Sequence, residues 1–262
     1  MWARISRLSS SRKANFSQKM AYIKGTPKTL IDRLEDHLRN NGATIIKSNG
    51  IKNIVSDKDK MIGVNLEKGE SIQSDIYVFT IPLPNFEKLI PDEYGDYKNK
   101  LKQIQYLDNI CLILKLHKPL TPFYMLNIQD PGIPFTGIIG LSHIYPPGEF
   151  DEYHIFYISK YILGENDFFK KTKEEILSIY MPHFKKINPE FNESWIAGYE
   201  LSKGKNIEPF HGINYSQFIP EKKTVFENCF LVTTAQIYPE ITVLNTSVKV
   251  AEDFVKRSRE RI

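Results

Sequence analysis

The segment of the sequence best suited to chemistry lies near its end, at residues 229–254. It begins as an apolar strand, crosses a turn of small residues at 233–236 and continues into a helix from Asn245. A strand that leads through a turn into a helix N-terminus points backbone N–H groups outward, where they favour anionic groups such as phosphate. An ordinary strand–loop–helix connection explains the same pattern. The segment is therefore a candidate anion-binding site.

Other reactive side chains do not form a recognisable centre. His37, His183 and His211 do not combine with cysteine or acidic residues at metal-ligand spacing, so no metal site is predicted. The serines lack the strand-to-helix context of a nucleophile elbow. Cys111 and Cys229 each lie inside an apolar run and are predicted to be buried thiols rather than a disulfide.

The composition is that of a soluble globular protein of one large or two small domains. Of 262 residues, 41% are hydrophobic and 25% are charged. The net charge of +4 is not concentrated in one block, which is weak support for nucleic-acid binding. No apolar run approaches the roughly 18 residues needed to span a bilayer. Residues 1–20 are basic and Ser-rich without an apolar core, so they are no secretory signal, although they could pass for a transit peptide.

The first part of the chain predicts a helix followed by short strands. Thr26-Pro27 opens the helix, and Asn41-Gly42 ends it. Its expected apolar face consists of Leu30, Ile31, Leu34 and Leu38. Short strands are predicted at residues 43–47, 51–56, 61–67 and 71–72, followed at 75–81 by a strand buried on both faces.

The middle of the chain predicts a second region rich in strands. Helices are expected at residues 85–89, 97–104 and 173–186. Strands are expected at residues 109–117, 123–128, 135–143, 154–161 and 195–201. This order of elements indicates a mixed or antiparallel sheet covered by helices, which is an α+β layer architecture.

Several segments, taken in order, resemble the flavin-dependent amine oxidoreductase superfamily, which includes phytoene desaturases, protoporphyrinogen oxidases and monoamine oxidases. Residues 22–27 are similar to the family's Tyr-x-x-Gly-Gly helix start, and residues 42–54 to its Gly-Ala-x-Ile … Val-x-x-Ile segment. Residues 63–82 resemble the Gly-Val … Asp-Gly … Asp-x-Val-Val-x-Thr-x-Pro run that returns to the cofactor. Residues 154–161, 187–191 and 235–240 fit a bacterial subgroup. The resemblance covers nearly the whole chain and matches the C-terminal two-thirds of such proteins.

The resemblance implies an α+β fold of the α/β flavoprotein type with three parts. Residues 1–84 would form an incomplete FAD-binding domain, and residues 85–225 a substrate-binding domain. Residues 226–262 would return as a strand and helix to the FAD-binding domain.

Two departures from the family pattern weaken the expected flavin site. No G-x-G-x-x-G follows a first strand, so the phosphate-binding βαβ unit is expected to be missing and the chain to begin after it. The subgroup's Pro-Glu-Asp-Arg-Gly is replaced by residues 239–243, which end in Val243. A valine adds a Cβ where glycine allows close backbone approach to the cofactor.

The resemblance assigns site residues, each of which also has a plain structural explanation. The adenine side of FAD would be lined by Ile51, Thr80 and Pro82. The pyrophosphate–ribityl region and the flavin would be approached by Thr233, Thr234, Ala235, Gln236, Asn245 and Val248. On the sheet of the second region, the substrate-facing candidates are His143, Tyr145, Tyr157 and Tyr161. Core packing would explain the first set equally well, an ordinary strand-to-helix turn the second set, and packing or the rim of the sheet the third set.

The implied function is hydride transfer from a C–N or C–C bond to FAD, with a small-molecule substrate. The chain alone is expected to turn over little or nothing. It would be a truncated form, one half of a split enzyme with a separate N-terminal FAD-binding chain, or a non-catalytic substrate-binding remnant. Unpaired edges on strands 75–81 and 229–234 predict aggregation or a homodimer unless a partner covers them. The expected location is cytoplasmic or peripheral to the membrane.

Overall fold

The computed structural model describes residues 22–145 and 148–259, which form two compact units. Among the described residues, unit 1 consists of Pro27–Gln105 and the chain from Glu208 onward. Unit 2 consists of Tyr106–Ile207 and the short segment up to Thr26. The divisions therefore fall at residues 105/106 and 207/208, whereas the sequence-based boundaries were 84/85 and 225/226.

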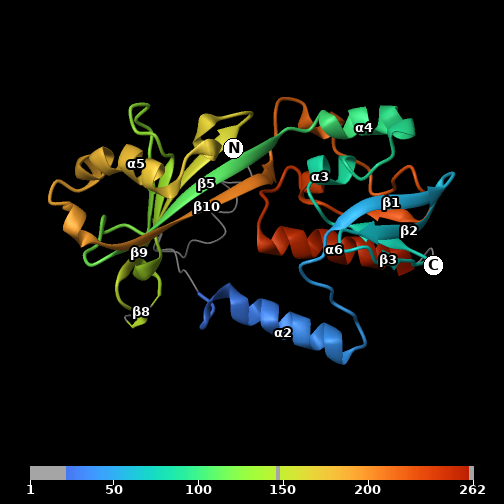
Figure 1. Ribbon diagram of the computed structural model, residues 1–262, viewed down its shortest axis with the longest axis horizontal. Coiled ribbons are helices and arrows are strands. Elements are labelled where there is room, and N and C mark those ends of the chain that lie inside the picture. Colours follow the sequence, from blue (N-terminus) through green and yellow to red (C-terminus); the bar gives the residue numbers. More distant parts are fainter. Residues whose placement is uncertain (1–21, 146–147, 260–262) are drawn as a thin grey trace, which may run out of the picture. The chain divides into compact units, whose positions relative to one another are not determined.

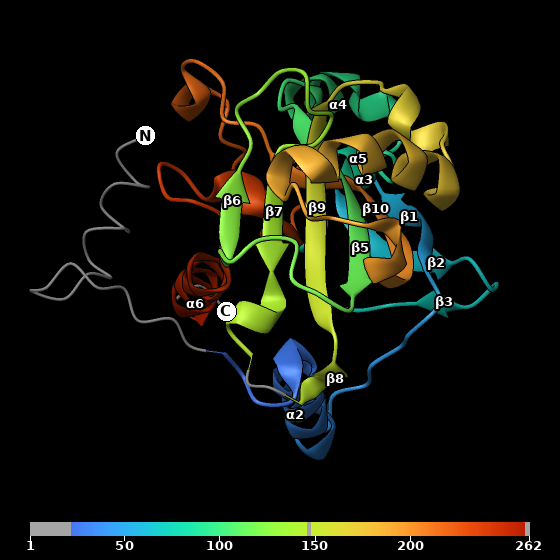
Figure 2. The same cartoon turned by 90° about the vertical axis from the view of Figure 1, so that its left-hand side faces the viewer.

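Unit 2 is built on a five-stranded sheet. The sheet contains β5 (Tyr106–Leu116), β6 (Met125–Asn127), β7 (Gly137–Gly140), β9 (His154–Leu163) and β10 (Ile196–Pro209), in the order β10-β5-β9-β7-β6. The pairs β5/β9, β7/β9 and β6/β7 are antiparallel. Figure 2 shows β6, β7, β9 and β5 side by side, and Figure 1 shows α5 (Lys173–Ile187) beside the sheet. A short strand, β8 (Glu149–Glu152), precedes β9.

The core of unit 2 lies between one face of this sheet and α5. Alternate residues of β5 are fully buried, among them Leu112 and Leu114. Helix α5 turns its own apolar side to them, with Tyr180 and Phe184 fully buried. The helix begins at a capping box in which Thr172 accepts from the Glu175 N–H at 3.2 Å.

Unit 1 holds two small sheets and four α-helices among its described residues. The antiparallel meander consists of β1 (Ile51–Asp57), β2 (Lys60–Leu66) and β3 (Ser71–Ile72). The second sheet is a parallel pair of β4 (Tyr77–Phe79) and β11 (Cys229–Leu231). The helices are α2 (Thr26–Asn40), α3 (Leu83–Glu87), α4 (Gly95–Lys102) and α6 (Leu244–Arg259).

Single turns of 3-10 helix connect many of these elements. They are η1 (Asp92–Tyr94), η2 (Leu141–His143), η3 (Asp167–Lys170), η4 (Glu193–Trp195), η5 (Tyr215–Gln217) and η6 (Thr234–Gln236). In the described part of the chain, no helix combines the length and the apolar character needed to cross a membrane.

The α+β fold class is confirmed, but three expectations for unit 1 are wrong. Residues 43–47 form no strand. Helix α2 forms as predicted, yet none of its residues is buried, so its apolar face has no partner among the described residues. The strand expected at 75–81 is short and is buried on one side only, because Tyr77 and Phe79 are buried while Ile76 and Val78 are exposed.

Candidate functional site

Residues that were predicted to contact the cofactor lie just after β4 and just after β11, at the carboxyl end of the parallel pair. Because Tyr77 lies opposite Cys229 and Phe79 opposite Leu231, the carboxyl ends of both strands point the same way. The Val232 N–H continues the pairing by donating to the Phe79 carbonyl at 2.9 Å. Thr80 and Pro82 follow β4, and residues 233–236 follow β11 at the same end. Ligands of open α/β sheets bind at the carboxyl ends of the strands.

In the turn after β11, the polar side chain of Gln236 makes its hydrogen bonds within the protein. The Gln236 side chain accepts from the Thr233 N–H at 3.2 Å and donates to the carbonyls of Leu231 at 3.0 Å and Pro220 at 3.2 Å. Thr233 and Ala235 are buried, whereas Thr234 is partly exposed. The Gln236 amide therefore has a structural role, although Gln236, like Thr234, is partly exposed.

At the start of α6, the Thr246 side chain also makes hydrogen bonds within the protein. The Thr246 Oγ1 accepts from the Val243 N–H at 3.0 Å and lies 2.8 Å from the Ile241 carbonyl oxygen, to which it can donate. Asn245 and Val248 are exposed on the first turns of the helix. Thr246 thus takes one of the N–H groups that an anion would otherwise bind.

These residues do not by themselves fit a flavin dinucleotide. Its pyrophosphate needs several outward N–H groups and a close backbone approach, which a glycine-rich turn supplies. Here Val243 stands where the family pattern has glycine, and Gln236 is turned inward. Ile51, at the start of β1, and Thr80 are exposed and leave room for contact with an adenine ring. The described residues among those predicted to bind the cofactor therefore supply no phosphate cradle.

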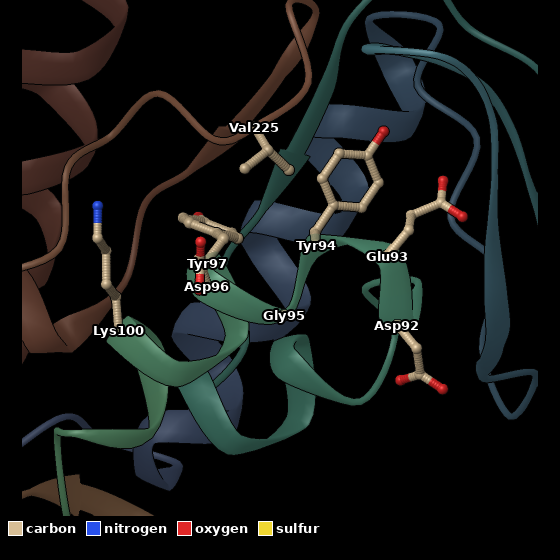
Figure 3. Close-up of a pocket in the computed structure, with 8 residues that line it drawn as sticks. All are labelled: Asp92, Glu93, Tyr94, Gly95, Asp96, Tyr97, Lys100 and Val225. Atoms are coloured by element: carbon tan, nitrogen blue, oxygen red, sulfur yellow. The ribbon is translucent and has the colours of Figure 1, made fainter.

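A surface hollow in unit 1 lies apart from these predicted residues. Figure 3 shows its lining from η1, α4 and the segment before β11, including Asp92, Tyr97, Lys100 and Val225. The Tyr97 hydroxyl has no hydrogen-bond partner among the described residues, and burial raises the pKa of this phenol well above its ordinary value. Nothing in the lining combines a nucleophile with a base, so the hollow has no evident chemistry.

The sheet of unit 2 has a second face, opposite α5, that is partly exposed. Ile113, Tyr157, Ile139 and Met125 lie opposite one another in a row across β5, β9, β7 and β6. These residues alternate with the core residues of their strands and therefore point away from α5. The row is apolar except for the Tyr157 hydroxyl, and it suits an apolar substrate.

A neighbouring row on this face adds polar groups. Cys111 lies opposite Ser159, and the Asn109 Nδ2 donates to the Ser159 Oγ at 2.7 Å. Burial raises the pKa of the Cys111 thiol to about 11, so the thiol stays protonated near neutral pH. Burial likewise raises the pKa of Tyr157. Neither group is therefore prepared to act as a base on this face.

The four predicted substrate-facing residues divide into two pairs. Tyr157 and Tyr161 lie on β9 as expected and point to the face opposite α5. His143 and Tyr145 lie on or just after η2, so their placement on a strand is wrong. The His143 Nε2 lies 2.8 Å from the Thr121 carbonyl oxygen, which fixes the ring in a structural role.

Tyr145 is held in an aromatic cluster. Its ring centre is 5.0 Å from that of Tyr22 and 5.2 Å from that of Phe150. Four residues share the sheet face opposite α5 but were not among the predicted site residues: Asn109, Cys111, Ile113 and Ile139. Alternation along 109–117 was the signal that could have identified the residues from β5.

Comparison with known proteins identifies the family. Residues 9–216 match the model of the flavin containing amine oxidoreductases. The chain belongs to this family, as the sequence resemblance predicted.

Three solved structures share the fold at low sequence identity. One is a protein from Exiguobacterium sp. that carries the assignment protoporphyrinogen oxidase, with TM-score 0.71, 14% identity and 89% of this chain covered. An oxidoreductase from Methanosarcina mazei matches at TM-score 0.64, with 16% identity over 88% of this chain. Reduced UDP-galactopyranose mutase matches at TM-score 0.54, with 12% identity over 72% of this chain.

The chain spans about half the length of these structures. The matches cover 51%, 54% and 41% of the three proteins, respectively. No curated protein gives a significant match to the sequence.

Proposed function

We propose that this protein is part of an FAD-dependent oxidoreductase that transfers a hydride from a C–N or C–C bond of an apolar substrate to flavin. The family match over residues 9–216 carries this proposal, because it includes both β4 with the residues that follow it and the whole five-stranded sheet of unit 2. Bound flavin supplies the hydride acceptor, so the protein need only place the substrate and exclude water. The absence of a catalytic triad or carboxylate pair is therefore no objection.

The chain's own contribution is the partly exposed sheet face of unit 2. Ile113, Ile139 and Met125 would pack against an apolar substrate and keep water away. The Tyr157 hydroxyl would orient it by one hydrogen bond, as a donor, because its raised pKa keeps the phenol protonated. Thr80, Pro82 and Ile51 would contact the adenine side of the cofactor.

The phosphate-binding part of the cofactor site must come from outside the described residues. The inward Gln236 amide and the valine at position 243 both support this requirement. The same two observations favour a second candidate function, a substrate-binding module without catalysis. This second function would also follow if Ile51, Thr80 and Pro82 do not bind FAD.

Binding of FAD, followed by flavin fluorescence anisotropy, tests the proposal. We expect weak binding that ADP competes away and that desalting removes, with no coloured protein recovered. Thr80→Trp should weaken this binding severalfold, because Thr80 is exposed and is proposed to contact the adenine side of FAD. Ser202→Trp, at an exposed position on β10, should leave FAD binding unchanged. Flavin that survives desalting would show that the described residues suffice. No binding even at the solubility limit of FAD would leave only the non-catalytic module.

A further inference from the structure

One charged side chain lies on the face of the unit 2 sheet that is opposite α5. Lys115 follows Ile113 by two positions on β5, so its side chain points to the same face. In the register of the sheet, Lys115 lies opposite Ile155 of β9, and both residues are partly exposed. The ammonium therefore borders the apolar row, which consists of Ile113, Tyr157, Ile139 and Met125.

The rest of this face is uncharged in the described strands β5, β9, β7 and β6. Every other residue that they place on the face is apolar, a glycine or an uncharged polar residue such as Ser159. On β10, which borders β5, the Glu200 carboxylate is paired with the Lys173 ammonium at 3.1 Å. The charge of Lys115 is thus left without a counter-charge on these four strands.

An aromatic ring holds the Lys115 ammonium in place. The Nζ lies 3.8 Å from the centre of the Tyr153 ring, and that ring lies 5.2 Å from the ring of His117. Among the described residues, Lys115 forms no ion pair and its ammonium donates no hydrogen bond. A ring face attracts a cation but does not neutralise its charge, so the ammonium keeps N–H donors for an anionic acceptor.

The number of charges selects the kind of anion. A carboxylate carries one negative charge, which one ammonium balances. A phosphate monoester carries about −1.5 to −2 at pH 7 and calls for several donors or for the bidentate fork of an arginine. The four strands place no arginine on this face. Lys115 therefore matches a carboxylate, and the apolar row beside it matches an apolar body.

We propose that the substrate bound on this face is an apolar carboxylic acid whose carboxylate is bound by the Lys115 ammonium. Alternate residues of a strand are about 6.7 Å apart, so the carboxylate would lie one such step along β5 from Ile113. The apolar body would cross the strands along the apolar row. The inference rests on the proposed function, because it names the substrate class of the same sheet face.

The two sides of the apolar row differ, which gives such a substrate one preferred orientation. Lys115 supplies a positive charge on one side. On the other side, the Ser159 hydroxyl accepts from the Asn109 Nδ2 at 2.7 Å and carries no charge. Because a few placed polar groups orient a ligand in an apolar site, the carboxylate would bind on the Lys115 side only.

Isothermal calorimetry with pyrenebutyrate, in the absence of flavin, tests the proposal. The methyl ester of the same acid lacks the charge, and pyrenebutylamine reverses it. At low salt the parent chain should bind the acid about tenfold more tightly than the ester and should bind the amine least. Added salt should reduce the preference for the acid, because it screens the charge of Lys115.

Four variants separate the charge from the apolar contact. Lys115→Gln should bind acid and ester equally, whereas Lys115→Arg keeps the charge and should retain the preference. The matched control, Lys205→Gln, removes a lysine of β10 that lies 5.7 Å from the centre of the Phe169 ring, and it should leave the preference unchanged. Ile139→Ser should weaken binding of acid and ester by the same factor, because it alters only the apolar row.

Acetylation of lysines, resolved by mass spectrometry, locates the bound acid directly. Pyrenebutyrate should slow the acetylation of Lys115 severalfold and leave that of Lys205 unchanged. Its methyl ester should protect Lys115 less than the acid does.

Several results would overturn the proposal. These are equal affinity for acid and ester in the parent chain, a preference that survives in Lys115→Gln, tighter binding of pyrenebutyl phosphate than of the acid, and no binding of the acid up to its solubility limit. Because the probes bind without flavin, the proposed function fails separately. A preference for the acid in a chain that does not bind FAD would refute the redox function alone, and FAD binding without that preference would refute the inference alone.

Discussion

Asn228 ties three segments of unit 1 together with one side chain. Its Oδ1 accepts from the Met61 N–H at 2.9 Å, while its Nδ2 donates to the carbonyls of Met61 at 2.9 Å and Asp75 at 3.0 Å. The residue thereby fixes β2 and the approach to β4 against the start of β11. None of these segments could keep this position by its own local sequence preference.

Asn228→Ala should lower the free energy of unfolding by about 2–3 kcal/mol, because it leaves backbone groups of Met61 and Asp75 without partners. Asn127→Ala, at an exposed position on β6, should change it by less than about 0.5 kcal/mol. Urea unfolding followed by circular dichroism measures both. Equal effects of the two variants would show that the Asn228 bonds contribute nothing.

The two thiols predict a loss of stability in alkaline solution. Burial raises the pKa of both Cys111 and Cys229 from 9.0 to about 11. A raised folded-state pKa means that the native protein holds the proton longer than the unfolded chain does. The stabilisation is therefore complete below pH 9 and is lost as pH rises toward 11.

Each thiol should account for a loss on the order of 2 kcal/mol across that range. The Cys111→Ala variant should lose correspondingly less stability than the parent chain between these two pH values. Urea unfolding at a series of pH values checks this. A parallel pH dependence of the two proteins would contradict the predicted thiol contribution.

At the scale of elements, the start of α5 depends on its capping box. Thr172 accepts from the Glu175 N–H, and the Glu175 carboxylate accepts from the Thr172 N–H at 2.7 Å. Thr172→Ala should cost about 1 kcal/mol of stability, within a usual range of about 0.5–2, whereas Thr172→Ser keeps the acceptor and should cost little. Thermal unfolding of the two variants compares them directly, and matching midpoints would exclude a role for the cap.

Elements with a strong local pattern were predictable from the sequence. The alternation at 109–117 predicts β5, and the apolar spacing at 173–186 predicts α5, because both pack on partners that their own periodicity specifies. The strand expected at 75–81 is longer than β4, and Val78, which the apolar pattern predicts to be buried, is exposed. A sequence pattern reports the capacity to be buried and not the presence of a partner.

The course of the chain at the candidate site was predictable in part. The sequence placed residues 233–236 after an apolar strand, as the structure does, but it placed Thr80 inside a strand that ends at Phe79. Parallel pairing brings the two segments together. The inward turn of Gln236 was not foreseeable, because its acceptors, including the Pro220 carbonyl, are set by the course of a loop. Tyr145 was misplaced for a similar reason, since its contact with Tyr22 joins residues far apart in sequence.

At the scale of the whole molecule, each unit has its own buried residues and should respond separately to local damage. Asn228→Ala should speed amide exchange in β1, β2 and β11 while leaving β5 and β9 unchanged. Thr172→Ala should do the reverse. Hydrogen exchange followed by mass spectrometry resolves the two patterns, and simultaneous acceleration in both units would show that they unfold as one cooperative body.

The sheet order of unit 2 brings the two ends of its main segment together. Strand β5 opens this segment and β10 closes it, and the two are neighbours in the sheet. The Asn206 N–H, near the end, donates to the Asp108 Oδ1, near the start, at 2.8 Å. A stretch of chain whose entry and exit coincide can be lengthened, exchanged or replaced without opening a gap in its host. Residues 106–207 can therefore behave as a cassette, whose sequence can diverge while unit 1 keeps its own sequence constraints.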